Sequence, residues 1–242
     1  MFSFFKKRNL VTDINWLGPD IHSHILPGID DGSKNVEQSL TYVRSLHDLG
    51  FQKMFFTPHI FGELYPNTKE SILNSLKLLT DALDSSNINL IGGAAAEHMV
   101  DYSFNIGDEL LCLPDKHILI EMSYLSETPN IEQVIFDLQV KGYKVILAHP
   151  ERYNFYHGNI TRYHRLREMG CYFQLNLLSI TGYYGKGVKQ ATEYLLSKEL
   201  YDLAGTDLHH DKHLSLLDRV IKSGELHKLI GYYQFKNMEL FG

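Results

Sequence analysis

Short apolar runs and amphipathic segments alternate along the chain, and this alternation predicts a repeated strand–helix unit. Apolar runs predict strands at 16–22, 53–57, 89–96, 117–120, 144–148, 172–175 and 201–204. Most of these runs are apolar throughout rather than alternating, which is typical of a parallel sheet covered on both faces. Strands that alternate with helices also favour parallel pairing.

The segments between the strands carry helical signals. Between 68 and 84, apolar residues recur at intervals of three and four, which places them on one face of a helix. Ser33 or Asn35 would cap an earlier helix that runs to about Leu49, where Gly50 ends it. Further helices are predicted near 130–141, 160–169, 187–198 and 213–222.

These units have short connections and contain no internal linker, so we expect one domain over residues 1–242 with an α/β fold. A single barrel of about seven strands is the natural arrangement, because 242 residues are close to the length of one α/β barrel. Residues 1–12 would form a flexible N-terminal arm or pack on a neighbour. Contact of this apolar and basic terminus with an anionic membrane surface is the alternative.

Composition narrows the functional classes. The formal charge of −6 argues against nonspecific nucleic-acid binding, which needs a basic face. No apolar stretch reaches the ~18 residues that cross a bilayer, so no stable membrane insertion is expected. The two cysteines, Cys112 and Cys171, form no CxxC pair, which favours the cytoplasm. Neither is followed six positions later by Arg, so the loop of thiol-dependent phosphatases is absent, and both are expected to be buried.

Potential metal ligands stand at six of the predicted strand ends and in the loop after the first strand. They are His22, His24, Asp31, His59, Glu97, Glu121, His149, Asp207 and His209. The carboxyl ends of barrel strands converge on one face, so these side chains should lie together. Imidazole and carboxylate donors without thiolate suit Mn²⁺, Fe or Zn²⁺. Nine donors exceed what one ion takes, so we expect two or three divalent ions that share carboxylates.

Residue spacing supports this site. His22 and His24 are two residues apart and point to the same side of a strand, and Asp207 and His209 repeat the pattern. Each histidine taken alone could equally be a core or surface residue. A carboxylate such as Glu97 at the end of an apolar strand is harder to reconcile with a purely structural role, because an unpaired buried charge is costly. Six other histidines are expected to be structural or exposed, namely His47, His98, His117, His157, His164 and His227.

Arg152 is the best candidate for binding an anion, because a guanidinium can grip phosphate oxygens with two hydrogen bonds. An ion pair with nearby Glu151 or another carboxylate is the alternative. Lys212, His210 and His213 could add donors, or they could simply form a polar helix start. Tyr183-Tyr184 could line the path of an aromatic substrate, although the pair could equally belong to a packed loop.

Eight segments carry recognisable motifs, namely Asp20–His24, Asp30–Gly32, Thr57–His59, Gly93–Glu97, Leu119–Glu121, Ala148–Arg152, Gly170–Asn176 and Thr206–His209. These motifs resemble those of the polymerase and histidinol phosphatase (PHP) superfamily. More narrowly, they resemble the metal-dependent bacterial protein-tyrosine phosphatases of capsule and exopolysaccharide operons. They fall within about residues 16–215, and His-x-His with Asp-Asp-Gly and a later His-Pro-Glu-Arg is the most specific combination.

The resemblance implies a distorted TIM-like (β/α)7 barrel, the PHP fold, with a trinuclear site that usually holds manganese, although Fe, Zn or Mg could serve. It implies three overlapping ligand sets: His22, His24, Glu97 and Asp207; Glu97, Glu121 and His149; and Asp31, His59 and His209. Arg152 matches the family's phosphate-contacting Arg. Relatives often carry a second Arg after the last motif, where this chain has Asp211–Leu214, and Lys212 could replace it as a point charge.

The leading hypothesis is therefore hydrolysis of phosphotyrosine on the C-terminal tail of a bacterial tyrosine kinase that regulates capsular or exopolysaccharide synthesis and export. A metal-bridging hydroxide would attack phosphorus, with Arg152, Asp207 and His209 in the catalytic set. A small-molecule phosphatase acting on a compound such as histidinol phosphate, a phosphodiesterase and a non-catalytic metal-stabilised scaffold of an export assembly are the alternatives. Apolar helix faces such as that of Val36, Leu40, Val43 and Leu46 suit core or subunit contact equally, so the oligomeric state is left open.

Overall fold

A computed structural model describes residues 10–83, 90–107 and 110–242. Most of the predicted N-terminal arm therefore lies outside the described residues, as do Asp84 and Asn89 at the ends of two predicted elements. Within the described ranges, no helix is both long enough and apolar enough to cross a membrane.

The paired strands run parallel and form two sheets. In one sheet β1 (Met54–Phe56) pairs with β3 (Ile91–Ala94). The other sheet has the order β2-β4-β5-β6-β7-β8, formed by His59–Ile60, Glu97–Met99, His117–Glu121, Lys144–Ala148, Tyr172–Asn176 and Leu203–Gly205. The second and third predicted strands correspond to β1 and β3, and each is followed across a short break by a further short strand, β2 or β4, which was not predicted.

The prediction of a first strand at 16–22 is wrong. Gly18 takes a left-handed φ of 90°, and Pro19 has no N–H for a sheet ladder. Asp20 and Ser23 form isolated parallel bridges instead, to Met54 of β1 and to Leu208 beyond β8. The segment 20–24 thus lies between β1 and β8, but the described strands do not form a closed sheet. The α/β class and parallel pairing are confirmed, whereas the predicted TIM-like barrel is not.

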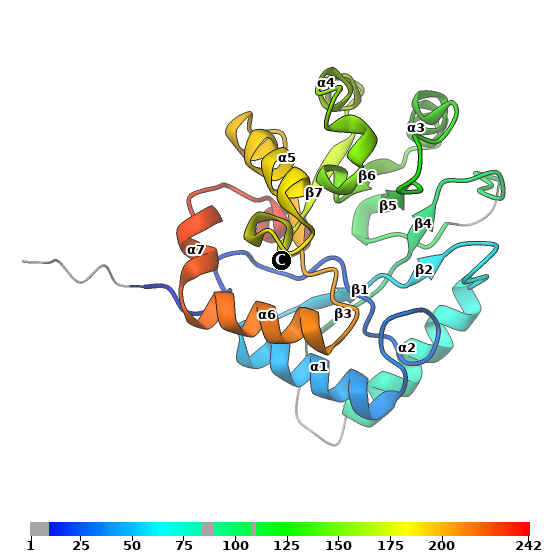
Figure 1. Ribbon diagram of the computed structural model, residues 1–242. Coiled ribbons are helices and arrows are strands. Elements are labelled where there is room, and N and C mark those ends of the chain that lie inside the picture. The colour runs from blue at the N-terminus through cyan, green and yellow to red at the C-terminus, as the bar shows by residue number, and fades with distance from the viewer. Residues whose placement is uncertain (1–9, 84–89, 108–109) are drawn as a thin grey trace, which may run out of the picture.

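The six longer helices match the predicted positions within a few residues, and they lie around the outside of the strands (Figure 1). They are α1 (Val36–Asp48), α2 (Lys69–Leu83), α3 (Ile131–Val140), α4 (Thr161–Glu168), α5 (Lys186–Ser197) and α6 (Asp211–Lys222). Asn35 caps α1, since its Oδ1 accepts a hydrogen bond of 2.9 Å from the Gln38 N–H. The short helices α7 (Glu225–Ile230) and α8 (Asn237–Phe241) were not predicted, because five or six residues carry little periodic signal.

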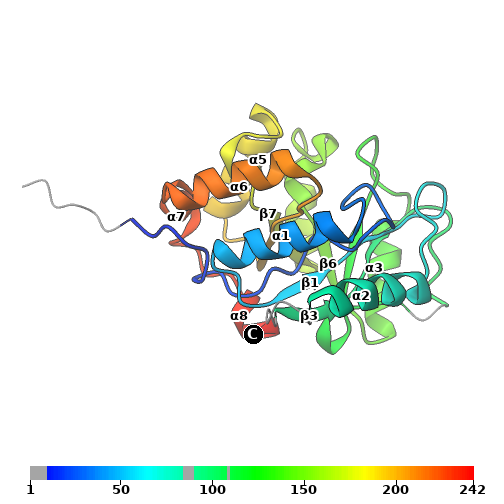
Figure 2. The same ribbon diagram turned by 90° about the horizontal axis from the view of Figure 1, so that it is seen from below.

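The apolar core has two parts. The larger part fills the space between the strands and the surrounding helices. The smaller part lies among the strands and joins strand residues such as Phe55, Leu119, Ile146 and Leu203 to Phe241 of α8. Figure 2 shows α8 at the C-terminal end of the chain, close to β1 and β3. This last helix therefore closes one end of the strand assembly, and the carboxyl ends of the strands lie at the other.

Asn237, the first residue of α8, ties this closure to the strands. Its buried Nδ2 donates to the carbonyls of Pro19 at 2.9 Å and Ala204 at 2.7 Å. Its Oδ1 accepts from the Ala204 N–H at 3.0 Å. One amide thus links β8 to the segment that leads into residues 20–24.

Replacing Asn237 with Ala should lower the free energy of unfolding by about 2–3 kcal/mol, because three buried backbone groups lose their hydrogen-bond partner. Urea denaturation followed by circular dichroism measures this change. Met238→Ala is the matched control, since Met238 is the next residue and is 59% exposed, and it should cost less than about 0.5 kcal/mol. Equal losses in the two variants would contradict the role of the amide.

Candidate metal centre

The nine predicted ligands come together at the side of the sheet where β5, β6, β7 and β8 end. His59 begins β2, Glu97 begins β4 and Glu121 ends β5, while the others lie in the segments that follow or join the strands. His149 and Asp207 take left-handed φ values of 33° and 50°. Such backbone conformations are strained for residues other than glycine and cluster at functional sites. Six of the nine are almost fully buried, namely His22, His24, Glu97, Glu121, His149 and Asp207.

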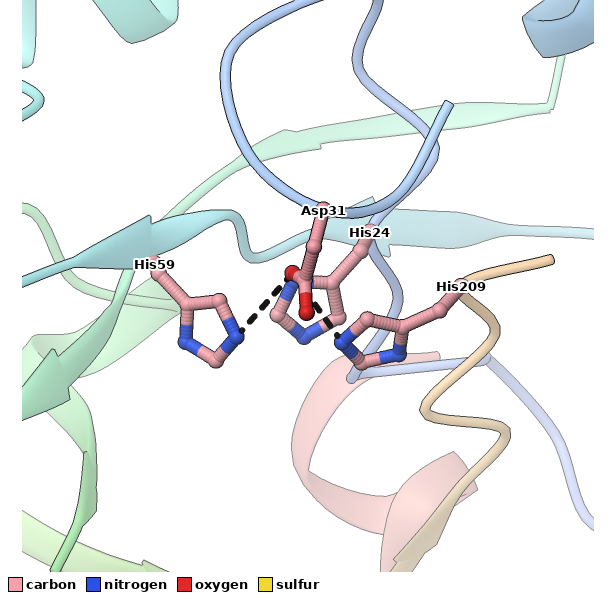
Figure 3. A group of neighbouring side chains, drawn as sticks. All are labelled: His24, Asp31, His59 and His209. Carbon is pink, nitrogen blue, oxygen red and sulfur yellow. Dashed lines mark ion pairs between the residues drawn. The ribbon is translucent and has the colours of Figure 1, made fainter. Parts of the chain in front are cut away.

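The donor atoms form four overlapping groups, and within each group they lie within 4.8 Å of one another. The groups are His24, Asp31, His59 and His209; His22, His24 and Asp207; His22, Glu97 and His149; and His59, Glu97 and Glu121. Figure 3 shows the first, in which Asp31 Oδ1 lies 3.5 Å from His59 Nε2 and 3.6 Å from His209 Nε2. These groups share members, as the predicted ligand sets do. The observed groups differ from the predicted sets in that Glu121 is grouped with His59 rather than with His149.

Glu97 is at the centre of this arrangement. Its Oε2 lies 3.4 Å from the Nε2 atoms of both His22 and His24 and 3.1 Å from His59 Nδ1. Its Oε1 lies 3.0 Å from His149 Nε2. Glu97 therefore contacts histidines from three different segments of the chain.

Several buried atoms of the centre suit a cation. Three of these atoms have no hydrogen-bond partner within the described part of the chain, namely Glu97 Oε2, Asp207 Oδ1 and His59 Nδ1. A buried carboxylate oxygen without a hydrogen bond is costly unless a positive charge compensates it. Imidazole and carboxylate donors in overlapping groups are also the ligands that divalent ions such as Mn²⁺, Fe²⁺ and Zn²⁺ prefer. The residues present thus fit divalent metal ions.

The electrostatics of the site agree with this assignment. Burial opposes charge on His24, but the nearby carboxylates of Asp30, Asp207 and Glu97 outweigh burial and raise its pKa well above the usual value. Burial would raise the pKa of Glu97, but His22 and the other imidazoles hold that pKa well below its usual value. The carboxylates of Glu97 and Asp207 therefore stay ionised, as a carboxylate must be in order to bind a metal ion.

Further residues orient the ligands, and the sequence did not assign them this role. His24 Nδ1 lies 2.8 Å from Asp30 Oδ2, and His22 Nδ1 lies 2.9 Å from Gln174 Oε1. Asn176 Nδ2 donates to Asp207 Oδ2 at 2.7 Å. Metal-binding histidines usually hold their second ring nitrogen in such a contact, which fixes the tautomer and the ring direction. Gln174 and Asn176 are two residues apart on a strand and so lie on one face of it, and this spacing could have identified them as partners of the ligands.

Buried Glu151 fixes the turn between His149 and Arg152. Its carboxylate accepts hydrogen bonds from the Asn176 N–H at 3.0 Å, from Ser179 Oγ at 2.7 Å and from Tyr201 Oη at 2.9 Å. Burial raises the pKa of this carboxyl group, although these hydrogen bonds favour the charged form. Glu151 is thus occupied by neutral donors, and it is not the ion-pair partner of Arg152.

A cavity of about 670 Å³ opens over the centre. Ligands line it together with Arg152, whose Nη1 donates to Asp207 Oδ2 at 2.7 Å. The rest of the wall is largely aromatic or apolar, formed by Phe61, Leu64, Tyr65, Met99, Tyr124, Leu125, Tyr183 and Tyr184. The sequence left Tyr183-Tyr184 open between a substrate path and a packed loop, and both residues line the cavity. Phe61, Tyr65 and Tyr124 were missed because their positions carry no metal-binding motif.

Other predicted donors fall in different places. Lys212 is exposed and lines a separate hollow on α6 beside Arg219, so its predicted contact with phosphate has no geometric support. His210 caps α6 and, like His213, lines the cavity. Within the described ranges, the six histidines expected to be structural or exposed take part in none of the four donor groups.

Comparison with known proteins agrees with this geometry. Residues 19–216 match the family described as capsular polysaccharide synthesis, CpsB/CapC. The chain is 30% identical over 197 residues to the tyrosine-protein phosphatase YwqE of Bacillus subtilis, covering 80% of this chain and 78% of that protein. It is 28% identical over 200 residues to the tyrosine-protein phosphatase CpsB of Streptococcus pneumoniae, covering 79% and 82%.

A solved structure from work on YwqE and CpsB, described there as unique metal-dependent tyrosine phosphatases, is also similar. It superposes with a TM-score of 0.79 at 29% identity over 92% of this chain and 93% of that one. The family match spans most of the chain and includes every predicted metal ligand, from His22 to His209. The chain therefore belongs to the CpsB/CapC family of capsular polysaccharide synthesis proteins, which confirms the resemblance read from its motifs.

Proposed function

We propose that this chain is a metal-dependent protein-tyrosine phosphatase. The observation that carries the proposal is a cluster of nine potential metal ligands, six of them almost fully buried, that opens into a cavity with aromatic walls beside Arg152. The names of the related proteins YwqE and CpsB support the same activity. A site of this kind suits an aryl phosphate, since the ions would take the phosphoryl group and the aromatic wall the phenyl ring.

Some residues of the site would bind the metal ions, and Arg152 would bind phosphate. Divalent ions, when bound, supply Lewis acidity toward phosphoryl oxygens and an activated water at neutral pH. The nine ligands hold these ions, and Asp207 also holds Arg152 through its second oxygen. Further guanidinium N–H groups are then directed to equatorial phosphate oxygens. A tyrosine phenolate is a good leaving group, so little general-acid help is needed.

We extend the proposal to features that the sequence suggested. Nine donors in four groups support two or three ions, and the resemblance to the PHP superfamily supports manganese. A distorted (β/α)7 barrel in one domain is supported by the position of residues 20–24 between β1 and β8. Membership of a capsule-synthesis family supports the tail of a bacterial tyrosine kinase as the substrate. Two free cysteines, Cys112 and Cys171, support a cytoplasmic location.

The activity is tested on protein stripped of metal by chelation and then reloaded with Mn²⁺, Mg²⁺, Zn²⁺ or Fe²⁺. We expect kcat/KM on a phosphotyrosine peptide to exceed that on histidinol phosphate or a phosphoserine peptide by about tenfold or more, because the aromatic wall favours a phenyl ring. Stronger turnover of histidinol phosphate would favour the small-molecule phosphatase instead. Full metal loading without turnover of any phosphoester would support a scaffold.

Substitutions separate the two groups of residues. Asp207→Ala should reduce kcat more than about 100-fold and lower the metal content, because it removes the carboxylate grouped with His22 and His24, which also holds Arg152. Arg152→Lys should keep the metal content and raise KM about tenfold through the lost second hydrogen bond.

Lys212→Ala should leave kcat/KM within about twofold, since Lys212 lies outside the cavity. A tenfold loss in Lys212→Ala would restore the phosphate contact predicted from sequence.

Thiol alkylation distinguishes this mechanism from that of a cysteine phosphatase. Burial raises the pKa of the Cys171 thiol to about 12 and that of Cys112 to about 11, so neither forms a thiolate at neutral pH. We expect iodoacetamide to leave the rate of phosphotyrosine hydrolysis unchanged, while chelation abolishes it. Rapid inactivation by iodoacetamide with the metal retained would contradict the mechanism.

A further inference from the structure

Two tyrosines lie against Arg152, and the role that we infer for them rests on the proposed function. The Cζ atom of Arg152 lies 4.7 Å from the centre of the Tyr124 ring and 4.3 Å from the centre of the Tyr184 ring. At these distances the face of an aromatic ring attracts a guanidinium. The Arg152 side chain is 19% exposed, so this attraction acts largely away from bulk water, where it is strongest.

The two rings belong to different segments, and each is anchored independently. Tyr124 follows β5, and its ring centre lies 5.9 Å from that of His149 and 6.0 Å from that of buried Tyr153. Tyr184 precedes α5, and its hydroxyl oxygen accepts a hydrogen bond of 3.0 Å from Asn176 Nδ2. Because each ring also contacts groups other than Arg152, the rings can hold the guanidinium.

Asp207 supplies the third contact to this guanidinium. Its Oδ2 accepts from Arg152 Nη1 at 2.7 Å and from Asn176 Nδ2 at 2.7 Å. The Asn176 amide therefore holds both Asp207 and Tyr184. A guanidinium fixed by one hydrogen bond alone can still turn about that bond, whereas contact with two rings restricts its plane.

We propose that Tyr124 and Tyr184 are positioning residues, which hold Arg152 in the orientation that receives the phosphoryl group of an aryl phosphate. Their contribution would be to phosphate binding rather than to metal binding, because both rings contact Arg152 and neither side chain carries a carboxylate or imidazole donor. Holding a long side chain in its bound orientation beforehand reduces the entropy that is lost when the ligand binds. The aromatic faces, and not the hydroxyl groups, are the part that acts on Arg152.

Tyr124→Leu and Tyr124→Phe test this role on the Mn²⁺-loaded full chain. Tyr124→Leu should weaken the binding of inorganic phosphate about five- to thirtyfold and raise KM for a phosphotyrosine peptide by a similar factor, with kcat changed less. Tyr124→Phe keeps the ring face and should stay within about twofold of wild type. Tyr232→Leu is the matched control, because Tyr232 is 67% exposed and does not line the cavity. Isothermal titration measures phosphate binding, and metal analysis confirms equal loading.

A double-mutant cycle shows whether the rings act through Arg152. In the Arg152→Ala background, Tyr124→Leu should weaken phosphate binding by less than about twofold, because the partner of the ring is gone. An undiminished effect there, or unchanged phosphate binding in Tyr124→Leu alone, would overturn the inference. Tyr184→Leu provides a second test with the same criterion if Tyr124→Leu does not fold.

The outcomes also separate this inference from the proposed function. A wild-type protein that binds phosphate through Arg152 and the two rings but does not hydrolyse phosphotyrosine would contradict the function and leave the positioning role intact. Normal hydrolysis with no effect of either Tyr→Leu variant would remove the positioning role and leave the function.

Discussion

Buried carboxylates and imidazoles require partners that compensate their charge. The arrangement of the ligand segments at the carboxyl ends of the strands depends on this constraint. Asp207 Oδ1 lies 3.3 Å from His22 Nε2 and 3.4 Å from His24 Nε2, and Glu97 Oε2 lies about as close to both. Hydrocarbon neighbours could not stabilise these charges. Because the donors come from six separate segments, the parallel strands must assemble before any set of ligands is complete.

A buried contact beneath the ligands sets the distance between two of these segments. The Thr206 N–H and Oγ1 donate to the two carboxylate oxygens of Asp20 at 2.9 Å and 2.6 Å. Burial raises the pKa of Asp20 to about 6, although both hydrogen bonds favour the charged form. Asp20 lies two residues before His22, and Thr206 directly precedes Asp207. This pair therefore holds the first ligand segment against β8, where the strands do not form a continuous ladder.

Much of the fold could be predicted, but some of it could not. Apolar runs and helical spacing placed β5, β6, β7 and the six longer helices, because each element is long enough to show its own period. The segment 16–22 is also apolar, yet Gly18 and Pro19 prevent a regular strand there. The short helix α8 carries almost no periodic signal, and its place depends on Phe241 filling the space among the strands and on the amide of Asn237.

The sequence by itself determined which residues could bind metal, because a carboxylate or imidazole at the end of a buried apolar strand needs a partner that compensates its charge or polarity. It also determined that Arg152 would be near them, since the two motif residues His149 and Arg152 are three apart. Only the tertiary structure decided that Lys212 lies outside the cavity and that Tyr124 and Tyr184 lie against Arg152. Such contacts join loops far apart in the chain, and no local period or spacing encodes the direction in which a loop side chain points.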